Sequence, residues 1–511
     1  MQTIHVGVGP VSFDDLVRVA REGAPVTLTD GALDAIDRAR GVVEALAAAE
    51  TPTYGVSTGF GALATRHIPT EMRAQLQRSL VRSHAAGSGP EVEREVVRAL
   101  MLLRLSTLAT GRTGVRRETA QLMADLLSHG ITPVVREYGS LGCSGDLAPL
   151  SHCALALMGE GEVRDATGTL MPAAEALAAA GLEPVELVAK EGLALINGTD
   201  GMLGMLVMAI TDLRVLLRTA DVAAAMSVEG QLGTDRVFAA ELQDIRPHPG
   251  QALSAANLTA LMADSAIVAS HRTGDCNRVQ DAYSLRCSPQ VHGAARDTVE
   301  HAATVAGREL ASAIDNPVVV GDRVESNGNF HGAPVAYVLD FLAIVAADVA
   351  SISERRTDRF LDKARSHGLP PFLADDPGVD SGHMIAQYTQ ASIVSELKRL
   401  AVPASVDSIP SSAMQEDHVS MGWNAARKLR RSVDGLTRVV AIEVLTAARA
   451  LDMRQLEPSP ATGAVVRLLR ESGVEGPGPD RYLSPEIETA VSLVQSGAVV
   501  RAVESVIGEL S

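Results

Sequence analysis

Aromatic side chains are scarce in this chain of 511 residues, at 3% of the total, although 46% of the residues are hydrophobic. The interior is therefore expected to be aliphatic and to consist mainly of Ala, Leu and Val. A chain of this length can bury a very large core, and it usually forms more than one lobe.

Cysteine and positive charge are also in short supply. The four cysteines show neither CxxC spacing nor the density of a disulfide framework, which fits a reducing cytosol and provides no metal motif. The formal net charge of -17 argues against nucleic acid or an anionic membrane as a partner. The cysteines are Cys143, Cys153, Cys276 and Cys287.

Targeting segments and membrane spans are not expected either. The first five residues lack a basic region followed by an apolar stretch, so no signal peptide is predicted. The apolar run 204–210 is followed by Asp212 and Arg214, and it is too short to cross a bilayer. These absences predict a cytoplasmic protein without a membrane partner.

Helical periodicity is the main pattern that the sequence does contain. Apolar residues recur at three- and four-residue spacing, and several such stretches exceed the usual helix length of about three turns. An all-α fold is therefore predicted, with at most a trace of β structure and with a central bundle of long helices. The long helices are expected at 202–229, 292–313, 333–356, 382–400 and 421–451, and shorter ones at 30–49, 71–86, 92–110 and 117–128.

Smaller features divide the chain into regions. Residues 12–15 have the pattern of a capping box at the start of a short helix, and residues 163–171 that of a hairpin. We expect three consecutive regions: an N-terminal lobe over 1–200, the long-helix bundle over 201–460 and C-terminal helices over 461–511.

One turn has unusual chemical potential. Cys143, Ser144 and Gly145 lie in a glycine-punctuated run, and glycine has no side chain, so the Gly145 nitrogen can approach the Cys143 carbonyl carbon. Attack with loss of two waters would close a five-membered ring and leave Ser144 as a methylidene. The product, 4-methylidene-imidazol-5-one (MIO), is an electrophile that needs no external cofactor. An ordinary turn is the alternative, because small-Ser-Gly is a common tripeptide.

The residue after this turn is expected to start a helix. Asp146 has the side chain of a helix cap, and the predicted helix spans residues 147–158. The partly positive N-terminal end of that helix would favour an anion that develops on the ring.

The run 139–150 resembles the signature of the aromatic amino acid ammonia-lyase family, whose members act on histidine, phenylalanine or tyrosine. The family usually has Ala-Ser-Gly, and Cys143 replaces the alanine without affecting cyclisation, because that side chain only decorates the ring. The resemblance extends over nearly the whole chain. It implies an ammonia-lyase/fumarase-like architecture, in which a mixed N-terminal lobe carries the MIO loop beside the long central bundle.

The resemblance also implies catalytic roles for particular residues. Tyr54 lies in a Gly-, Ser- and Thr-rich run similar to the family's lid, whose tyrosine takes the β-proton of the substrate; read alone, it would be a surface contact. Arg286 would pair with the substrate carboxylate, a task suited to its planar fork, although an isolated loop arginine is usually solvated or structural. Tyr283 would line the same pocket as a catalytic residue, and Gln280 would line it as a binding residue. Ala282 stands where histidine-specific members of the family often have a proline.

Further residues are implied to bind the substrate, each with a structural alternative. Asn197 would contact the ring oxygen and the substrate amine, or simply cap the helix that follows. Phe330 would pack beside the electrophile, or serve as a core residue. His84 would meet the aromatic ring of the substrate, or interact with the end of its own helix.

The run 411–421 is the best clue to the substrate. Read alone, its Gln-Glu-Asp-His sequence suggests a metal cluster, but no further ligands occur at suitable spacing, so no metal site is predicted. The run resembles the histidine-specific form of the family, with Met414 in place of the usual Asn, whereas the phenylalanine and tyrosine enzymes carry an Asn-Gln-Asp-Val-type run. Glu416 together with His84 would then recognise an imidazole.

The implied reaction is the elimination of ammonia from L-histidine to give trans-urocanate, the first step of histidine degradation. The implied partner is this small amino acid, and the implied assembly is a homotetramer whose active sites are shared between subunits. A tyrosine ammonia-lyase or an aromatic aminomutase on the same scaffold remains open. So does a helical scaffold protein whose Cys143-Ser144-Gly145 turn never cyclises.

Overall fold

The computed structural model describes residues 2–49, 55, 58–59, 63, 66, 68–142, 145–272 and 278–511. Tyr54, Cys143, Ser144 and Cys276 lie outside the described residues. The chain divides into two compact units, each made of three stretches. Unit 1 comprises Met1–Met208, Ala303–Asp340 and Pro403–Arg427, and unit 2 comprises Ala209–Ala302, Phe341–Val402 and Lys428–Ser511. The three consecutive regions expected from the sequence remain a prediction.

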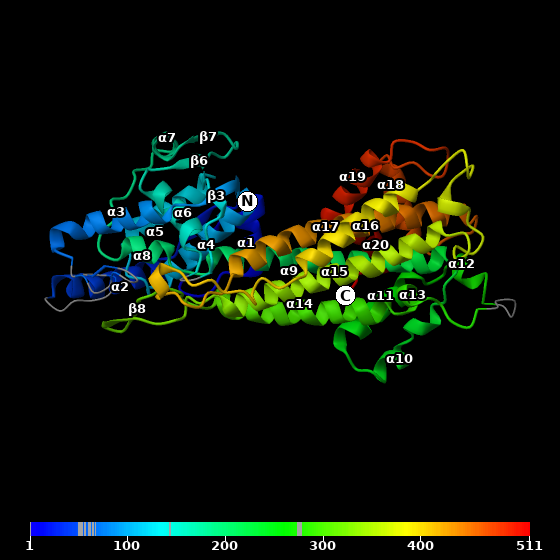
Figure 1. Ribbon diagram of the computed structural model, residues 1–511, viewed down its shortest axis with the longest axis horizontal. Helices are drawn as coiled ribbons and strands as arrows, with labels where there is room; N and C mark the ends of the chain where they lie inside the picture. Colours follow the sequence, from blue (N-terminus) through cyan, green and yellow to red (C-terminus); the bar gives the residue numbers. More distant parts are fainter. Residues whose placement is uncertain are drawn as a thin grey trace. The chain divides into compact units, whose positions relative to one another are not determined.

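Five long helices confirm the periodicity pattern (Figure 1). Their bounds differ by a few residues from those predicted, because helix ends are decided by individual contacts rather than by periodicity. The helices are α9 (Asp200–Gly230), α14 (Ser288–Leu310), α15 (Ala333–Leu361), α16 (Met384–Leu400) and α17 (Gly422–Met453).

The remaining helices of unit 1 are shorter, and the first of them starts as expected. Ser12 and Asp15 form the predicted capping box, in which each side chain meets the other residue's backbone N–H. The helices are α1 (Phe13–Val17), α2 (Asp30–Ala48), α3 (Arg73–His84), α4 (Arg94–Ala109), α5 (Arg117–Ser128), α6 (Leu147–Leu157), α7 (Ala173–Ala179) and α8 (Glu191–Ile196).

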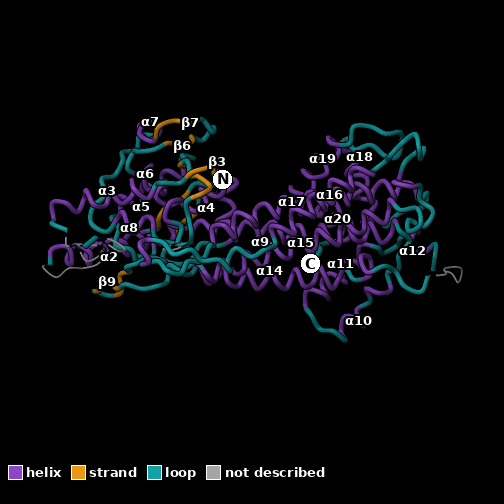
Figure 2. The backbone as a smooth tube through the Cα atoms, viewed as in Figure 1, coloured by secondary structure: helices purple, strands orange, loops and turns teal. Residues whose placement is uncertain are grey.

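The described strands all belong to unit 1 and form small sheets (Figure 2). β1 (Ile4–Val6) pairs in parallel with β2 (Val26–Leu28), and β3 (Ser88–Glu91) pairs antiparallel with β5 (Arg136–Tyr138). β4 (Thr132–Pro133), β6 (Glu162–Arg164) and β7 (Leu170–Pro172) form a three-stranded sheet that contains the predicted hairpin. The fold class is all-α, as predicted.

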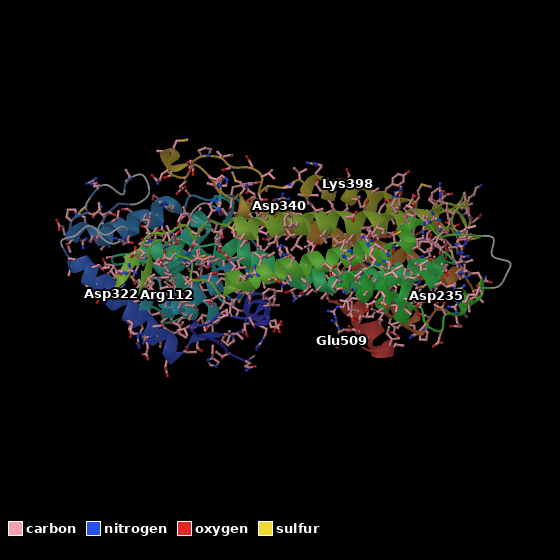
Figure 3. The ribbon with its side chains drawn as sticks, turned by 90° about the horizontal axis from the view of Figure 1, so that it is seen from below. Arg112, Asp235, Asp322, Asp340, Lys398 and Glu509 are labelled. Carbon is pink, nitrogen blue, oxygen red and sulfur yellow. The ribbon has the colours of Figure 1, made fainter. Side chains whose placement is uncertain are left out.

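A second hairpin, of β8 (Val318–Val320) and β9 (Arg323–Glu325), is attached to the loop before α5. The Val319 N–H donates to the Arg112 carbonyl at 2.7 Å, and the Arg112 guanidinium donates to the Val319 carbonyl at 3.4 Å (Figure 3). This attachment fixes the chain directly after residues 314–316, which contact the candidate site.

Unit 2 adds short helices to its portions of the long ones. Charged side chains such as Lys398 and Glu509 lie exposed on it (Figure 3). Its short helices are α10 (Ala240–Asp244), α11 (Pro249–Leu261), α12 (Ala266–Ala269), α13 (Tyr283–Arg286), α18 (Pro460–Glu471), α19 (Ser484–Gln495) and α20 (Ala498–Ile507).

The core is aliphatic, as the composition predicted. The described part of α4 buries all but two of its residues, and the buried guanidinium of Arg98 is accommodated by donating to the Val19 and Leu127 carbonyls. Among the described helices, α15 is long and apolar enough to cross a membrane, and the bent pair of α19 and α20 passes the same test together. Because 67% of the apolar window of α15 is buried, a core helix accounts for it equally well.

Candidate active site

Gly142 precedes the three residues predicted to cyclise, and Gly145 is the last of them. Gly142 and Gly145 pair through an isolated antiparallel bridge, with φ angles of 73° and 78°. A Cβ on Gly145 would lie 1.9 Å from the Gly198 carbonyl oxygen, and on Gly142 it would lie 2.1 Å from Ser420 Oγ. Only glycine fits these left-handed, crowded positions, so the backbone can turn sharply at Gly142 and at Gly145.

Hydrogen bonds from distant segments hold this turn. Ser420 Oγ donates to the Gly142 carbonyl at 3.2 Å, and the Met421 N–H donates to the Leu141 carbonyl at 2.9 Å. The Trp423 indole donates to the Glu137 carbonyl at 2.7 Å. The segment that leads into α17 therefore acts as a support for the turn.

The prediction that the Asp146 side chain caps the following helix is wrong. It occupies the N-cap position of α6, but its side chain makes no capping bond there. Instead, its Oδ2 accepts from the N–H groups of Gly201 and Met202 at 2.8 and 3.0 Å, and its Oδ1 accepts from Ser140 Oγ at 3.0 Å. The unpaired N–H groups at the start of α9 compete successfully for the carboxyl. Burial raises the pKa of Asp146 to about 7.

Asn197 ends α8 rather than capping the following helix, because α9 begins only at Asp200. Its Nδ2 donates to the Asn316 carbonyl at 2.8 Å, and its own carbonyl accepts from the Arg104 guanidinium at 2.8 Å. Its Oδ1 is buried without a hydrogen-bond partner among the residues that the structure describes. The next residue, Gly198, is bridged to Gly145, so the backbone directly after Asn197 contacts the turn.

His84 and Glu416 lie in distant stretches of the sequence that both belong to unit 1. His84 is the last residue of α3, and its Nδ1 lies 3.0 Å from Ser83 Oγ. Burial lowers the pKa of His84, and the negative charge of the nearby Glu416 opposes that shift. Glu416 Oε2 accepts from Ser411 Oγ at 2.9 Å, which orients the carboxylate. His84 and Glu416 therefore interact electrostatically.

Phe330 lies half-buried in the turn before α15, next to a pair of histidines that sequence reasoning missed. The rings of His331 and His418 stack with centroids 5.3 Å apart, and His331 Nε2 lies 3.2 Å from His418 Nδ1. Because His331 Nδ1 accepts from the Ala333 N–H, its proton is on Nε2 and is donated to His418. The sequence offered one signal for this pair: His331 directly follows the candidate Phe330, and His418 is two positions after the candidate Glu416.

Gln280, Tyr283 and Arg286 lie in unit 2, on α13 or just before it. The guanidinium carbon of Arg286 lies 4.8 Å from the centre of the Tyr283 ring, within the range of a cation–π contact. Within the described ranges, Arg286 Nε is buried without a hydrogen-bond partner. Tyr283 is 72% exposed. The predicted site residues thus fall into two groups, one in each unit.

A metal centre finds no support in the described part of the chain. No group of three or more His, Cys, Asp or Glu side chains is placed there to hold a metal ion. Burial raises the pKa of the Cys153 thiol well above its ordinary value.

Residues 11–471 match the family described as aromatic amino acid lyase. A histidine ammonia-lyase from Streptomyces griseus is 67% identical over 515 residues, which cover 100% of both chains. A solved tyrosine aminomutase from Streptomyces globisporus has a TM-score of 0.94 at 37% identity, covering 100% of both chains. A solved histidine ammonia-lyase from Trypanosoma cruzi has a TM-score of 0.90 at 38% identity, covering 99% of this chain and 95% of the other. The chain therefore belongs to the aromatic amino acid lyase family.

Proposed function

We propose that this carbon–nitrogen lyase eliminates ammonia from L-histidine to give trans-urocanate, the first step of histidine degradation. The observation that carries the proposal is the electrostatic interaction of Glu416 with His84 in a chain 67% identical over its whole length to a histidine ammonia-lyase. A carboxylate and an imidazole can hydrogen-bond the donor and acceptor of a substrate imidazole, whereas a phenyl ring offers neither.

The family depends on MIO, and we assign its formation to Cys143, Ser144 and Gly145 without an external cofactor. The described surroundings fit such a group, because Gly142 and Gly145 have left-handed backbones in crowded positions and Gly198, which follows Asn197, is bridged to Gly145. When formed, the group supplies an electrophile that turns the substrate amine into a better leaving group.

The chain's own residues perform the remaining tasks. Tyr54 removes the β-proton of the substrate. Arg286 binds the substrate carboxylate through its planar fork, and the Tyr283 ring under its guanidinium holds that fork in place. Gln280 lines the same pocket.

The other substrate contacts come from unit 1. Asn197 Oδ1 accepts a hydrogen bond from the substrate amine, which satisfies its buried oxygen. Phe330 packs beside the electrophile and excludes water from it. His84 and Glu416 bind the imidazole of the substrate.

We further propose that the protein is a cytoplasmic homotetramer with active sites shared between subunits, and that it binds neither nucleic acid nor membrane. The net charge of -17 supports the lack of anionic partners.

The second candidate function is that of an aromatic aminomutase. The TM-score of 0.94 with a tyrosine aminomutase favours it, because the same scaffold serves both reactions. An aminomutase would retain the ammonia and add it back at the β-carbon, so its product is a β-amino acid.

A parallel product assay tests the proposal. Purified protein is offered histidine, tyrosine and phenylalanine, and urocanate, coumarate, cinnamate and β-amino acids are quantified. We expect urocanate to form fastest and phenylalanine to be almost inert, because a site that hydrogen-bonds a polar group can reject an analogue lacking that group by about 10⁴-fold. Faster release of coumarate than of urocanate overturns the substrate, and a β-amino acid as the main product indicates the aminomutase.

Two matched variants sharpen this assay. Glu416→Gln keeps the shape of the side chain and removes its charge, so turnover of histidine should fall by about 10²-fold or more without real phenylalanine activity. Asp417→Asn makes the equivalent change at the neighbouring exposed position and should leave turnover within about twofold. Equal losses in the two variants would show that Glu416 has no specific role.

A further inference from the structure

Lys190 and Asp315 form a buried ion pair in unit 1 that the proposed mechanism leaves unused. Lys190 Nζ lies 2.5 Å from Asp315 Oδ2, and both side chains are 0% exposed. Burial lowers the pKa of Lys190 and raises that of Asp315, and each charge opposes the shift of the other. Burying two charges is costly, and such pairs add little net stability compared with apolar residues. The pair is therefore better explained by a role in positioning its neighbours than by a contribution to stability.

The pair anchors one end of the helix that carries Asn197. Lys190 is the residue before α8, with a left-handed φ of 71°, and Asn197 is the residue after it. Six residues are too few for a helix to be stable by itself, so the direction of α8 depends on what holds its ends.

The other end of α8 is held by the same segment that contains Asp315. Asn197 Nδ2 donates to the Asn316 carbonyl at 2.8 Å. Arg104 reinforces the contact, because its Nη1 donates to the Asn197 carbonyl at 2.8 Å and its Nη2 to the Ile314 carbonyl at 2.9 Å. Residues 314–316 therefore bind α8 at both of its ends.

The position of the Asn316 carbonyl depends in turn on Asp315. Asp315 Oδ1 accepts from the Asn316 N–H at 2.7 Å, while Oδ2 meets Lys190. Asn327 completes the frame, because its Nδ2 donates to the Asp315 carbonyl and its N–H to Asn316 Oδ1, both at 3.0 Å. The side-chain amide of Asn197 is thus held by Nδ2, which leaves Oδ1 as its free atom.

We propose that Lys190 and Asp315 are positioning residues for the elimination: their ion pair fixes residues 314–316, which orient Asn197 so that its Oδ1 receives the substrate amine. This inference rests on the proposed function, which assigns the substrate amine to Asn197. Neither Lys190 nor Asp315 touches the substrate, so their effect must pass through Asn197.

A double-mutant cycle on the full-length protein tests this dependence. The pair variant Lys190→Met/Asp315→Asn removes both charges together, so no unpaired charge is buried and folding is expected. It is combined with Asn197→Ala, and kcat/KM is measured in all four proteins. We expect the pair variant to lower kcat/KM by about tenfold or more when Asn197 is present, because small misplacements of a contact group are costly. In the Asn197→Ala background the further loss should be under about twofold.

A second buried ion pair provides the control. Arg356 and Glu443, in unit 2, are also 0% exposed and 2.5 Å apart. The variant Arg356→Met/Glu443→Gln should change kcat/KM per folded protein by the same factor with or without Asn197. Thermal unfolding gives the folded fraction, and intact mass shows whether the two waters have been lost from the turn at 143–145 in each variant.

Several outcomes would overturn the inference. One is an equal loss of kcat/KM from the Lys190/Asp315 change with and without Asn197, and another is an equally large coupling between the control pair and Asn197. A third is a Lys190/Asp315 variant whose mass includes the two waters, which would assign the pair to ring formation. Wild-type protein that converts tyrosine or phenylalanine but not histidine overturns the proposed substrate alone, and the cycle is then read on the substrate converted. Wild-type protein that converts none of the three overturns both.

Discussion

Asn197 shows how a single atom can define this site. Asn197 Oδ1 is a buried acceptor without a partner among the described residues, and an unsatisfied buried polar group costs roughly 1–3 kcal/mol. Its other amide atom and its backbone carbonyl are both bonded, so the free oxygen is a specific feature of an otherwise satisfied group. Such an atom is consistent with a ligand that completes it.

At this scale, Ser144→Ala should change both mass and activity. The wild-type chain should be lighter than its sequence by two waters, and the variant should have the full sequence mass and almost no turnover, because alanine lacks the hydroxyl that leaves. Intact mass spectrometry and the urocanate assay measure the two effects. Ser151→Ala, in α6, makes the same change nearby and should keep the missing mass. An active wild-type protein with its full sequence mass would contradict the prediction.

At the scale of secondary-structure elements, Asp146 joins two helix starts. It precedes α6 in the chain, and its carboxyl binds the first N–H groups of α9. Ser140 Oγ lies 3.0 Å from Asp146 Oδ1 and 3.4 Å from the Gly145 carbonyl. A protonated Asp146 could therefore donate to Ser140, which would donate to Gly145, so the neutral acid fits this network as well.

The raised pKa of Asp146 predicts a pH-dependent stability. Its value of about 7 exceeds the ordinary 3.8, so the folded protein binds more protons than the unfolded chain between these values. The stabilisation is complete below pH 3.8 and is lost as pH rises to about 7, by an amount of order 4 kcal/mol. Asp146→Asn imitates the neutral acid and does not titrate, so its free energy of unfolding should fall less over this range.

Urea unfolding at a series of pH values measures this difference. Asp322→Asn, in the exposed turn of the β8–β9 hairpin, is the control and should keep the wild-type slope. Identical slopes for wild type and Asp146→Asn would show that Asp146 does not titrate in this range.

At the scale of the whole molecule, the site residues are divided between two units. Asn197, Phe330 and Glu416 belong to unit 1, whereas Tyr283 and Arg286 belong to unit 2. The exposure of Tyr283 and the free Nε of Arg286 are consistent with a pocket completed by another subunit. The proposed shared homotetramer makes each chain contribute to more than one site.

Complementation between inactive variants tests this sharing. Ser144→Ala and Arg286→Gln should each be nearly inactive, and co-expressed tetramers should regain activity, because about a quarter of randomly assembled sites would contain both wild-type residues. Turnover of the co-purified mixture is compared with that of each variant alone. If mixing restores nothing while sedimentation shows mixed tetramers, the sites lie within single chains.

Local patterns in the sequence determined the helices and the short motifs. α5 spans the predicted residues 117–128, and the capping box at Ser12 and the hairpin at 163–171 are present, because each depends on neighbours only a few positions away. The family signature likewise lies in contiguous runs. These features require no knowledge of which distant segments meet.

The tertiary structure alone decided the partners of the polar groups. Asp146 binds a helix start 55 residues away, His331 meets His418 across 87 residues, and Lys190 pairs with Asp315 across 125. A carboxyl beside one helix start looks like its cap in the sequence, but burial makes every nearby unpaired N–H a competitor for it. Which competitor wins depends on the packing of segments remote in sequence, and local periodicity contains no information about that packing.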